Sequence, residues 1–438
     1  MLRYVIIGCG AAGVAAAESL RRCDPHADLL PICEEADGYY SRPGLAYYLT
    51  GEIPETQLYP FSEKDYRRLN LRPLHARVVG IHPAEYRVEL QNGKSIAYDR
   101  LLIATGASAV RADVPGQDFE GVVKLDTLDE ARRILKFAHK ARSAVIVGGG
   151  ITALELVEGL RARGVKTHYF LRSDRYWSNV LDETESQIVE GRLKEEGVQI
   201  HYHTELAEIL GKGGRVVGVR TKDGRQIPCG IAAIAIGVRQ RKELAVAAGL
   251  KVDRGILVDE YLQTNHPHIY AAGDVAQVYD PFSGKSIVDS LWGPAVEQGH
   301  AAGLNMTGQK VTYLKTVAFN VTRLAGLTTT IIGTVGQGRD DDLVGIARGD
   351  SETWRQMPDA IASQNNFSVN RLRVLVGKQT MVGGIVMGDQ TLSRAVHHLI
   401  AQKVDITPIR EQLLQPDNTS LGDLIADFYT HWRSSAAA

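Results

Sequence analysis

A glycine-rich segment near the start of the chain has the residue types and spacing of a phosphate-binding loop. Gly8-Cys9-Gly10-Ala11-Ala12-Gly13 follows an apolar strand expected over residues 4–7 and opens an alanine-rich helix expected to end near Arg22. The first glycine permits a tight turn, the second lets a phosphate approach the backbone, and the third allows close packing of helix on strand. Free N–H groups at the helix start favour an anion. We therefore predict that Gly8, Gly10, Ala12 and Gly13 bind a dinucleotide.

An acidic residue lies at the position where a dinucleotide-binding unit of this kind needs one, at the end of its second strand. The strand expected over residues 29–33 ends at Glu34, and Glu34 lies 21 residues beyond Gly13 (34 − 13 = 21). A carboxylate at that spacing accepts hydrogen bonds from a ribose. Glu34, with Glu35 beside it, is predicted to bind the nucleoside part of the ligand.

The same pattern returns 140 residues later (148 − 8 = 140). A strand over 144–147, the turn Gly148-Gly149-Gly150-Ile151-Thr152-Ala153 and a helix over 152–163 lead into a strand over 167–171. This duplicated βαβ unit predicts a second dinucleotide site, at which Gly148, Gly150, Ile151 and Thr152 contact the ligand.

The second unit departs from the first where an acid is expected. Leu171 and Arg172 stand at the end of its second strand. An acid there holds a free 2′-hydroxyl, whereas an arginine accommodates a 2′-phosphate. Arg172 therefore slightly favours NADPH over NADH. The alternative is that Arg172 is a solvated surface charge.

Three further apolar strands end in residues that suit a nucleotide site. Strand 101–103 runs into Ala104-Thr105-Gly106, a weaker copy over 234–236 ends at Gly237, and strand 269–272 ends in Gly273-Asp274.

Strands that alternate with helices predict an α/β fold with parallel sheets covered by helices, here as two Rossmann-like three-layer units. Alternating strands over 316–388 and a helical tail from Thr391 predict a separate C-terminal α/β domain.

Composition excludes several classes of protein. Glycine makes up 44 of 438 residues, about 10% against a usual level of about 7%. The formal net charge of −1 lacks the basic surplus of a nucleic-acid binder. No run of about 18 apolar residues is present, so we expect no membrane span. The N-terminus loosely imitates a signal peptide, but the glycine motif explains the same residues better.

The four cysteines and the paired histidines suggest neither a disulfide framework nor a metal site. No CxxC pair occurs, so we expect reduced cysteines, a cytoplasmic location, and Cys9 and Cys33 as small buried apolar residues. The histidines at 201 and 203 and at 266 and 268 have no cysteine or carboxylate partners at useful spacing, so we expect no metal.

Taken together, the two dinucleotide motifs, Ala104-Thr105-Gly106 between them and Gly273-Asp274 after them resemble the two-dinucleotide-domain flavoprotein reductases of glutathione-reductase type. The resemblance covers the whole chain and is strongest over residues 1–310. It implies an FAD domain (1–113 and 242–312) split by an NAD(P) domain (114–241). It also implies a C-terminal interface domain (313–438), by which the family often forms homodimers. The first loop would bind FAD and the second NAD(P)H.

The resemblance also assigns roles to single residues. Asp274 matches the aspartate near the flavin ribityl and phosphate groups, and Leu291-Trp292 falls where the helix beside the flavin ring begins. Val78 matches a backbone contact to the adenine. Glu155 matches a glutamate near the nicotinamide and flavin, which makes it the catalytic candidate; its alternative is a helix surface charge.

The segment from Tyr39 to Gly51 narrows the resemblance to a subgroup of these flavoprotein reductases. It is similar to the flavin-binding turn of NAD(P)H-nitrite reductase flavin domains, rubredoxin and ferredoxin reductases, and apoptosis-inducing-factor-like proteins, with Arg42 as the flavin-side arginine. Disulfide reductases carry two cysteines here and NADH oxidases one. This segment has none, and Pro43 occupies the NADH oxidase position.

The resemblance therefore implies an FAD-dependent NAD(P)H:acceptor oxidoreductase without a redox-active disulfide. Hydride would pass from NAD(P)H to N5 of FAD, and electrons would then pass to a rubredoxin, a ferredoxin or a partner subunit. Two alternatives stay open. The first is a flavin-bearing NAD(P)H sensor or scaffold with low turnover, and the second is a peroxide-forming NAD(P)H oxidase.

Overall fold

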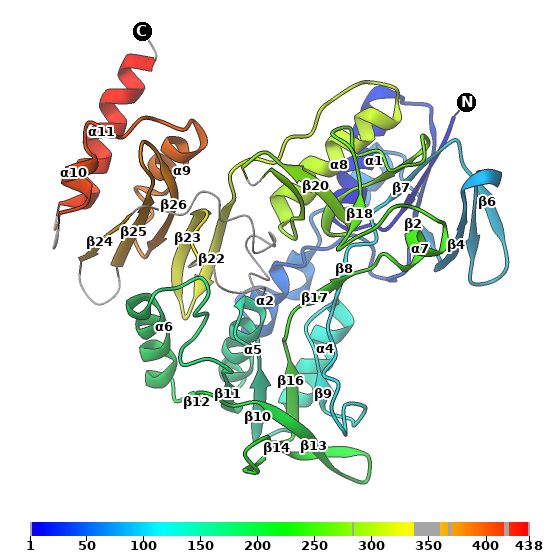
Figure 1. Cartoon of the computed structure of the whole chain (residues 1–438). Coiled ribbons are helices and arrows are strands. Elements are labelled where there is room, and N and C mark those ends of the chain that lie inside the picture. Colours follow the sequence, from blue (N-terminus) through cyan, green and yellow to red (C-terminus); the bar gives the residue numbers. More distant parts are fainter. Residues whose placement is uncertain (1, 283, 337–359, 367–369, 416–419, 437–438) are drawn as a thin grey trace.

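The N-terminal glycine loop belongs to a five-stranded parallel sheet (Figure 1). The computed structural model describes residues 2–282, 284–336, 360–366, 370–415 and 420–436. The strands of this sheet, in spatial order, are β19 (Ile269–Ala271), β7 (Arg100–Ile103), β1 (Arg3–Ile7), β2 (Asp28–Cys33) and β3 (Leu74–His75). Four consecutive residues of β1, Tyr4 to Ile7, are buried, as expected for a parallel strand with both faces covered.

Two helices pack together beside this sheet. They are α1 (Ala11–Cys23), which follows the glycine loop, and α8 (Trp292–Met306), from much later in the chain (Figure 1). A Cβ atom at Gly299 of α8 would collide with the carbonyl oxygen of Ala12 in α1. Glycine therefore lets the helices approach closely, and this approach places the start of α8 beside the loop.

The second glycine loop lies at a second five-stranded parallel sheet. Its strands, in order, are β12 (Gln199–His201), β11 (Lys166–Phe170), β10 (Ser143–Val147), β16 (Ile231–Ile234) and β9 (Val122–Val123). Its helices are α4 (Leu128–Ala138), α5 (Ile151–Ala162) and α6 (Glu183–Glu195). The predicted α/β class with two Rossmann-type sheets is confirmed.

The two units meet through α2 (Gly44–Thr50), which packs on α5. A Cβ atom at Gly159 of α5 would lie 2.8 Å from Cβ of Leu49, and Nε of Arg163 donates to the main-chain oxygen of Leu49 (2.8 Å). A two-stranded link, β8 (Ala107–Ala109) with β17 (Val238–Gln240), also connects the units. The segment that carries Arg42 is thus held against the helix that carries Glu155.

Smaller elements complete these units. They are α3 (Glu63–Arg68), β4 (Val78–His82), β5 (Arg87–Leu90), β6 (Ser95–Ala97), β13 (Leu206–Lys212), β14 (Arg215–Thr221), β15 (Gln226–Pro228), α7 (Glu243–Ala247), β18 (Ile256–Leu257), β20 (Ala276–Asp280), β21 (Lys285–Val288) and the 3₁₀ turns η1 (Glu55–Leu58), η2 (Pro83–Glu85) and η3 (Gly273–Val275).

A five-stranded antiparallel sheet follows in the last third of the chain (Figure 1). Its order is β22 (Phe319–Leu324), β23 (Leu327–Gly333), β26 (Met381–Met387), β25 (Asn370–Val376) and β24 (Ala360–Asn366). The helices α9 (Ser393–Ala401), α10 (Arg410–Leu413) and α11 (Leu421–Ala436) accompany it, and Ile332, Val374 and Val396 lie in their shared core. Within the described ranges, no helix combines the length and the apolar character that crossing a bilayer requires.

Candidate active site

A cavity of about 1350 Å³ opens at the carboxyl ends of β1, β2 and β7. In open α/β sheets, ligands bind beyond these strand ends. The cavity collects residues that lie far apart in the sequence. The predicted site residues that line it are Gly8, Gly10, Ala12, Glu34, Glu35, Arg42, Val78, Ala104, Thr105, Gly106, Thr152, Glu155, Gly273, Asp274, Leu291 and Trp292.

The remaining predicted residues lie elsewhere. Gly13 is buried under the first loop, where a Cβ atom would collide with the carbonyl oxygen of Gly8. The other five belong to the carboxyl edge of the second sheet and do not line this cavity. They are Gly148, Gly150, Ile151, Arg172 and Gly237.

The two glycine loops repeat the same backbone geometry. Gly8 and Gly148 have φ angles of +110° and +149°, and a Cβ atom at either would collide with a carbonyl oxygen of the neighbouring strand connection. Gly10 and Gly150 are the N-cap residues of α1 and α5, and no other atom lies within 4 Å of a Cβ built on either. The fold therefore requires glycine at positions 8 and 148. Gly10 and Gly150 instead leave open space at the start of a helix, where an anion is favoured.

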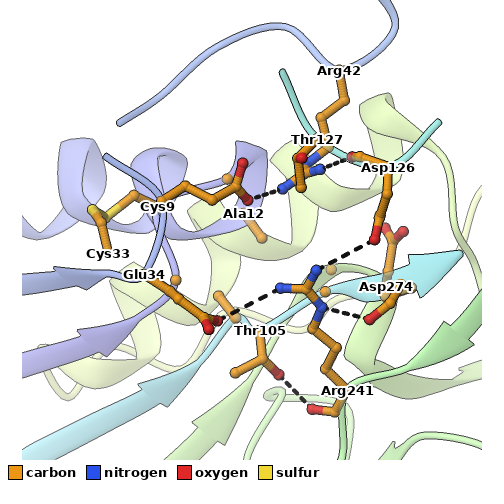
Figure 2. Close-up of a pocket in the computed structure, with 18 of the residues that line it drawn as sticks. Cys9, Ala12, Cys33, Glu34, Arg42, Thr105, Asp126, Thr127, Arg241 and Asp274 are labelled. Atoms are coloured by element: carbon orange, nitrogen blue, oxygen red, sulfur yellow. Dashed lines mark hydrogen bonds and ion pairs between the residues drawn. A yellow bond between two sulfur atoms is a disulfide. The ribbon is translucent and has the colours of Figure 1, made fainter. Parts of the chain in front are cut away.

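One side of the cavity is a network of charged groups. Arg42 donates hydrogen bonds to the carboxylate of Glu35 and to the main-chain oxygen of Asp126, and the Tyr40 hydroxyl donates to Glu35 (2.6 Å). The guanidinium of Arg241 lies 3.6 Å from the carboxylate of Asp126 and 3.9 Å from that of Glu34 (Figure 2). These contacts orient several acids around the cavity.

Sequence reasoning missed several polar residues that line the cavity, among them Tyr40, Asp126, Thr127 and Arg241. Tyr40 neighbours Arg42 in a recognised segment, and Arg241 follows Gly237 by four residues, which is a weak signal. Asp126 and Thr127 precede α4 in a loop without a motif, so no sequence pattern identifies them.

The cysteine prediction was wrong. Cys9 and Cys33 form a disulfide, so they are neither thiols nor merely small apolar residues, and the expectation of wholly reduced cysteines fails with them. The physical reason is the register of the sheet. Ile7 of β1 pairs with Ile32 of β2, so the residues just beyond come together, with Cα atoms 5.4 Å apart. Cys23 and Cys229 are free thiols.

Glu155 reaches the cavity from the second unit. It lies near the start of α5 and, with Thr152, lines the cavity wall. Burial, and then the neighbouring Glu158 carboxylate, raise the pKa of Glu155 to about 7. A carboxyl group of this kind changes charge near neutral pH, which is typical of groups with a catalytic role.

Trp292 lines another part of the cavity wall, and two aromatic side chains support it from behind. Trp292, the first residue of α8, stacks on Tyr39 with ring centroids 5.9 Å apart and planes 14° apart. Phe61 meets the Tyr39 ring edge-on at 5.3 Å. Flat apolar surfaces of this kind suit a planar ring system.

Comparison with known proteins assigns the chain to a family. The profile of the pyridine nucleotide-disulphide oxidoreductases matches residues 2–299. An NADH oxidase from Methanocaldococcus jannaschii is 30% identical over 74% of this chain and 75% of its own length. The ferredoxin–NAD(+) reductase component of a 3-phenylpropionate/cinnamic acid dioxygenase from Photorhabdus laumondii is 32% identical over 70% and 77%.

A solved structure shares this architecture along almost the whole chain. The ferredoxin reductase from Rhodopseudomonas palustris superposes with a TM-score of 0.83 at 25% identity, covering 95% of this chain and 98% of its own. The family profile spans both sheets and the cavity between them. The chain therefore belongs to the pyridine nucleotide-disulphide oxidoreductase family.

Proposed function

We propose that the protein is an FAD-dependent NAD(P)H:acceptor oxidoreductase that passes electrons to a small iron–sulfur protein of the ferredoxin type. The observation that carries this proposal is the shared cavity. Residues of the first glycine unit and Glu155 of the second line the same space, so ligands of the two units can meet there. The names of the ferredoxin reductases among its relatives support the choice of acceptor.

The residues of the cavity fit FAD. Gly10 leaves open space at the start of α1 for a pyrophosphate, and Glu34 stands where a ribose needs an acceptor. The buried Ser290 hydroxyl lines the cavity and has no hydrogen-bond partner among the described residues, so a polar ligand group can satisfy it. When bound, FAD supplies hydride acceptance at its N5 atom. Arg42 and Trp292 would then bind and orient the flavin.

Anaerobic mixing tests the proposal. The purified protein is mixed with NADH or NADPH, bleaching of the flavin absorbance is followed, and ferredoxin is then added. Rapid bleaching followed by ferredoxin reduction supports the reductase. Slow bleaching without turnover would favour an NAD(P)H sensor instead. In a parallel assay in air, oxygen consumption that exceeds ferredoxin reduction would favour an oxidase, the activity named for the Methanocaldococcus relative.

The Glu155 carboxylate is expected to assist hydride transfer. Above pH 7 it would be mostly ionised and would stabilise the positive charge that develops on a nicotinamide bound beside it, whereas below pH 7 it would be mostly neutral. The rate of flavin reduction should therefore rise as the pH increases through about 7. Glu155→Gln should remove this rise and slow reduction at pH 8 by about 10-fold, equivalent to about 1.4 kcal/mol. Stopped-flow reduction between pH 5 and 9 measures both effects.

Glu158→Gln is the matched control for Glu155. Glu158 lies on the same helix and its pKa is also raised to about 7, chiefly by burial, but it does not line the cavity. This variant should retain a pH-dependent rate. If Glu155→Gln keeps the parental pH profile, Glu155 has no part in hydride transfer.

Arg172 is proposed to favour NADPH by contacting the 2′-phosphate. It lies exposed just beyond the end of β11, in the second unit. Arg172→Gln should lower kcat/KM for NADPH by about 10-fold, since a charged contact to phosphate is lost, and should leave the value for NADH within about twofold. Steady-state assays with both nucleotides measure this. Arg175→Gln is the control, because Arg175 already pairs with Asp174 (3.1 Å). A parental protein with a strong NADH preference would contradict the assignment.

The proposal extends to the domains of the chain and to its oligomeric state. We propose an FAD domain (1–113 and 242–312), an NAD(P) domain (114–241) and an interface domain (313–438) through which two chains of 47.9 kDa form a homodimer in the cytoplasm. The antiparallel sheet of β22, β23, β26, β25 and β24 supports a distinct C-terminal unit. Sedimentation of the full chain tests the dimer, and a monomeric mass would refute it.

A further inference from the structure

The Cys9–Cys33 disulfide joins two parts of the proposed FAD site. Cys9 lies between Gly8 and Gly10 in the phosphate-binding loop, and Cys33 ends β2 directly before Glu34. Both cysteines line the cavity (Figure 2). Their Cα separation of 5.4 Å is in the usual range for a disulfide, about 4.4–6.8 Å. The bond therefore connects the loop that would hold the pyrophosphate to the acid that would hold the ribose.

The disulfide extends the pairing of β1 with β2 beyond the last paired residues, Ile7 and Ile32. Gly8 N donates to Ile32 O (2.9 Å), and the disulfide joins the next residue of each segment. Beyond it, α1 begins at Ala11, and its N-cap residue, Gly10, has no side chain that could hold the loop. After reduction, the two sulfur atoms separate to non-bonded contact and the covalent link between the loop and β2 is lost. Gly10 and Glu34 are then held relative to each other only by the backbone pairing of β1 and β2.

The two cysteines line the same cavity but differ in exposure. Cys33 is 5% exposed, whereas Cys9 is only partly buried. A reductant would therefore reach the Cys9 sulfur first, through the space that FAD would fill. Ligand and reductant compete for this space.

We propose that the Cys9–Cys33 pair is a thiol–disulfide exchange site whose oxidation state sets the affinity for FAD, the oxidised chain binding FAD more tightly. This inference rests on the proposed FAD-dependent function. The oxidised chain holds the loop and the acid in place before binding, which reduces the cost of ordering them. By linkage, FAD favours the disulfide by the same factor by which the disulfide favours FAD.

The exchange balances with a dithiol as the reductant. One thiolate of the dithiol attacks the Cys9 sulfur, forms a mixed disulfide and releases the Cys33 thiolate. The second thiol of the reagent then closes its own disulfide and releases the Cys9 thiolate. Two electrons pass from the dithiol to the protein, and the two protons of the dithiol end on Cys9 and Cys33.

The experiment uses the full chain with Cys23→Ser, which removes the exposed free thiol. Cys229 needs no change, because burial raises the pKa of its thiol to about 12 and keeps it unreactive. FAD affinity is measured by quenching of flavin fluorescence on the oxidised chain, on the chain reduced with dithiothreitol, and after reoxidation. Native thiols are counted with a chromogenic disulfide reagent, with and without FAD.

Reduction should expose two thiols and weaken FAD binding about 10-fold, within the usual range of coupling, and reoxidation should restore it. At a fixed ratio of reduced to oxidised dithiothreitol, bound FAD should shift the thiol–disulfide equilibrium toward the disulfide by about the same factor. The double variant Cys9→Ser/Cys33→Ser should bind FAD with the affinity of the reduced chain, and dithiothreitol should not change that affinity. Absence of new thiols, or affinities within twofold in both states, would overturn the inference and leave the proposed function standing. An oxidised chain that binds no FAD would overturn both.

Discussion

Gly10→Val is expected to abolish FAD binding while the protein stays folded. Gly10 has ordinary extended backbone angles (φ −80°, ψ −169°), which valine adopts without strain. A Cβ atom there meets no other protein atom within 4 Å, so the new side chain enters the cavity and not the core. It would occupy the space through which a pyrophosphate approaches the backbone. We expect the dissociation constant for FAD to rise at least about 100-fold, equivalent to about 2.8 kcal/mol.

Two other glycine variants distinguish a lost ligand from a lost fold. Gly8→Ala should destabilise the protein even without ligand, since φ is +110° and the added methyl group collides with the carbonyl oxygen of Ala104. Gly150→Val occupies open space at the second loop, so it should weaken NAD(P)H binding and spare FAD. Flavin fluorescence titrations and thermal unfolding of the ligand-free chains separate these outcomes. A Gly10→Val protein that binds FAD normally would mean that this loop does not hold the pyrophosphate.

The sequence predicts those parts of the site that depend on local spacing. The turn at Gly8, the helix start at Gly10 and the strand end at Glu34 follow from one short βαβ pattern, and the pattern repeats from Gly148. This pattern can be recognised in the sequence because each glycine is needed for a local reason, either its backbone angles or the space that a side chain would occupy. The α/β class and the two parallel sheets follow from the same alternation of strands and helices.

The missed residues depend on contacts between distant segments. Cys9 and Cys33 meet because β1 and β2 pair in one particular register, and their separation of 24 residues matches no redox motif. Arg241 and Asp126 come together only after the chain has returned from the second sheet to the first, where they lie 3.6 Å apart. No local pattern encodes such a meeting. Charged residues of this kind look like ordinary surface residues until the fold is known.

A buried ion pair holds the C-terminal sheet on the second unit. Arg373 of β25 donates from Nε and Nη2 to the two carboxylate oxygens of Glu185 in α6 (2.8 and 2.9 Å). The side chains of Arg373 and Glu185 are 3% and 0% exposed. Glu185 also accepts from the backbone N of Asp182 (2.9 Å) in the capping box of α6. One carboxylate thus orders a helix start and binds the neighbouring sheet.

Arg373→Met is expected to cost about 3 kcal/mol of stability, because the buried Glu185 carboxylate loses its two-bond partner and keeps only the longer contact with Arg371 Nε (3.6 Å). The urea midpoint of the transition that releases the C-terminal sheet should fall accordingly. Arg373→Met/Glu185→Gln should recover part of this loss, since a neutral amide needs no cationic partner and its oxygen can still accept from the backbone N of Asp182. Arg323→Met is the control, because its pair with Glu52 is partly exposed and is expected to contribute only about 0–1 kcal/mol. If Arg373→Met costs no more than Arg323→Met, the buried pair does not fix the sheet, and apolar contacts such as that of Leu327 with the second unit must do so.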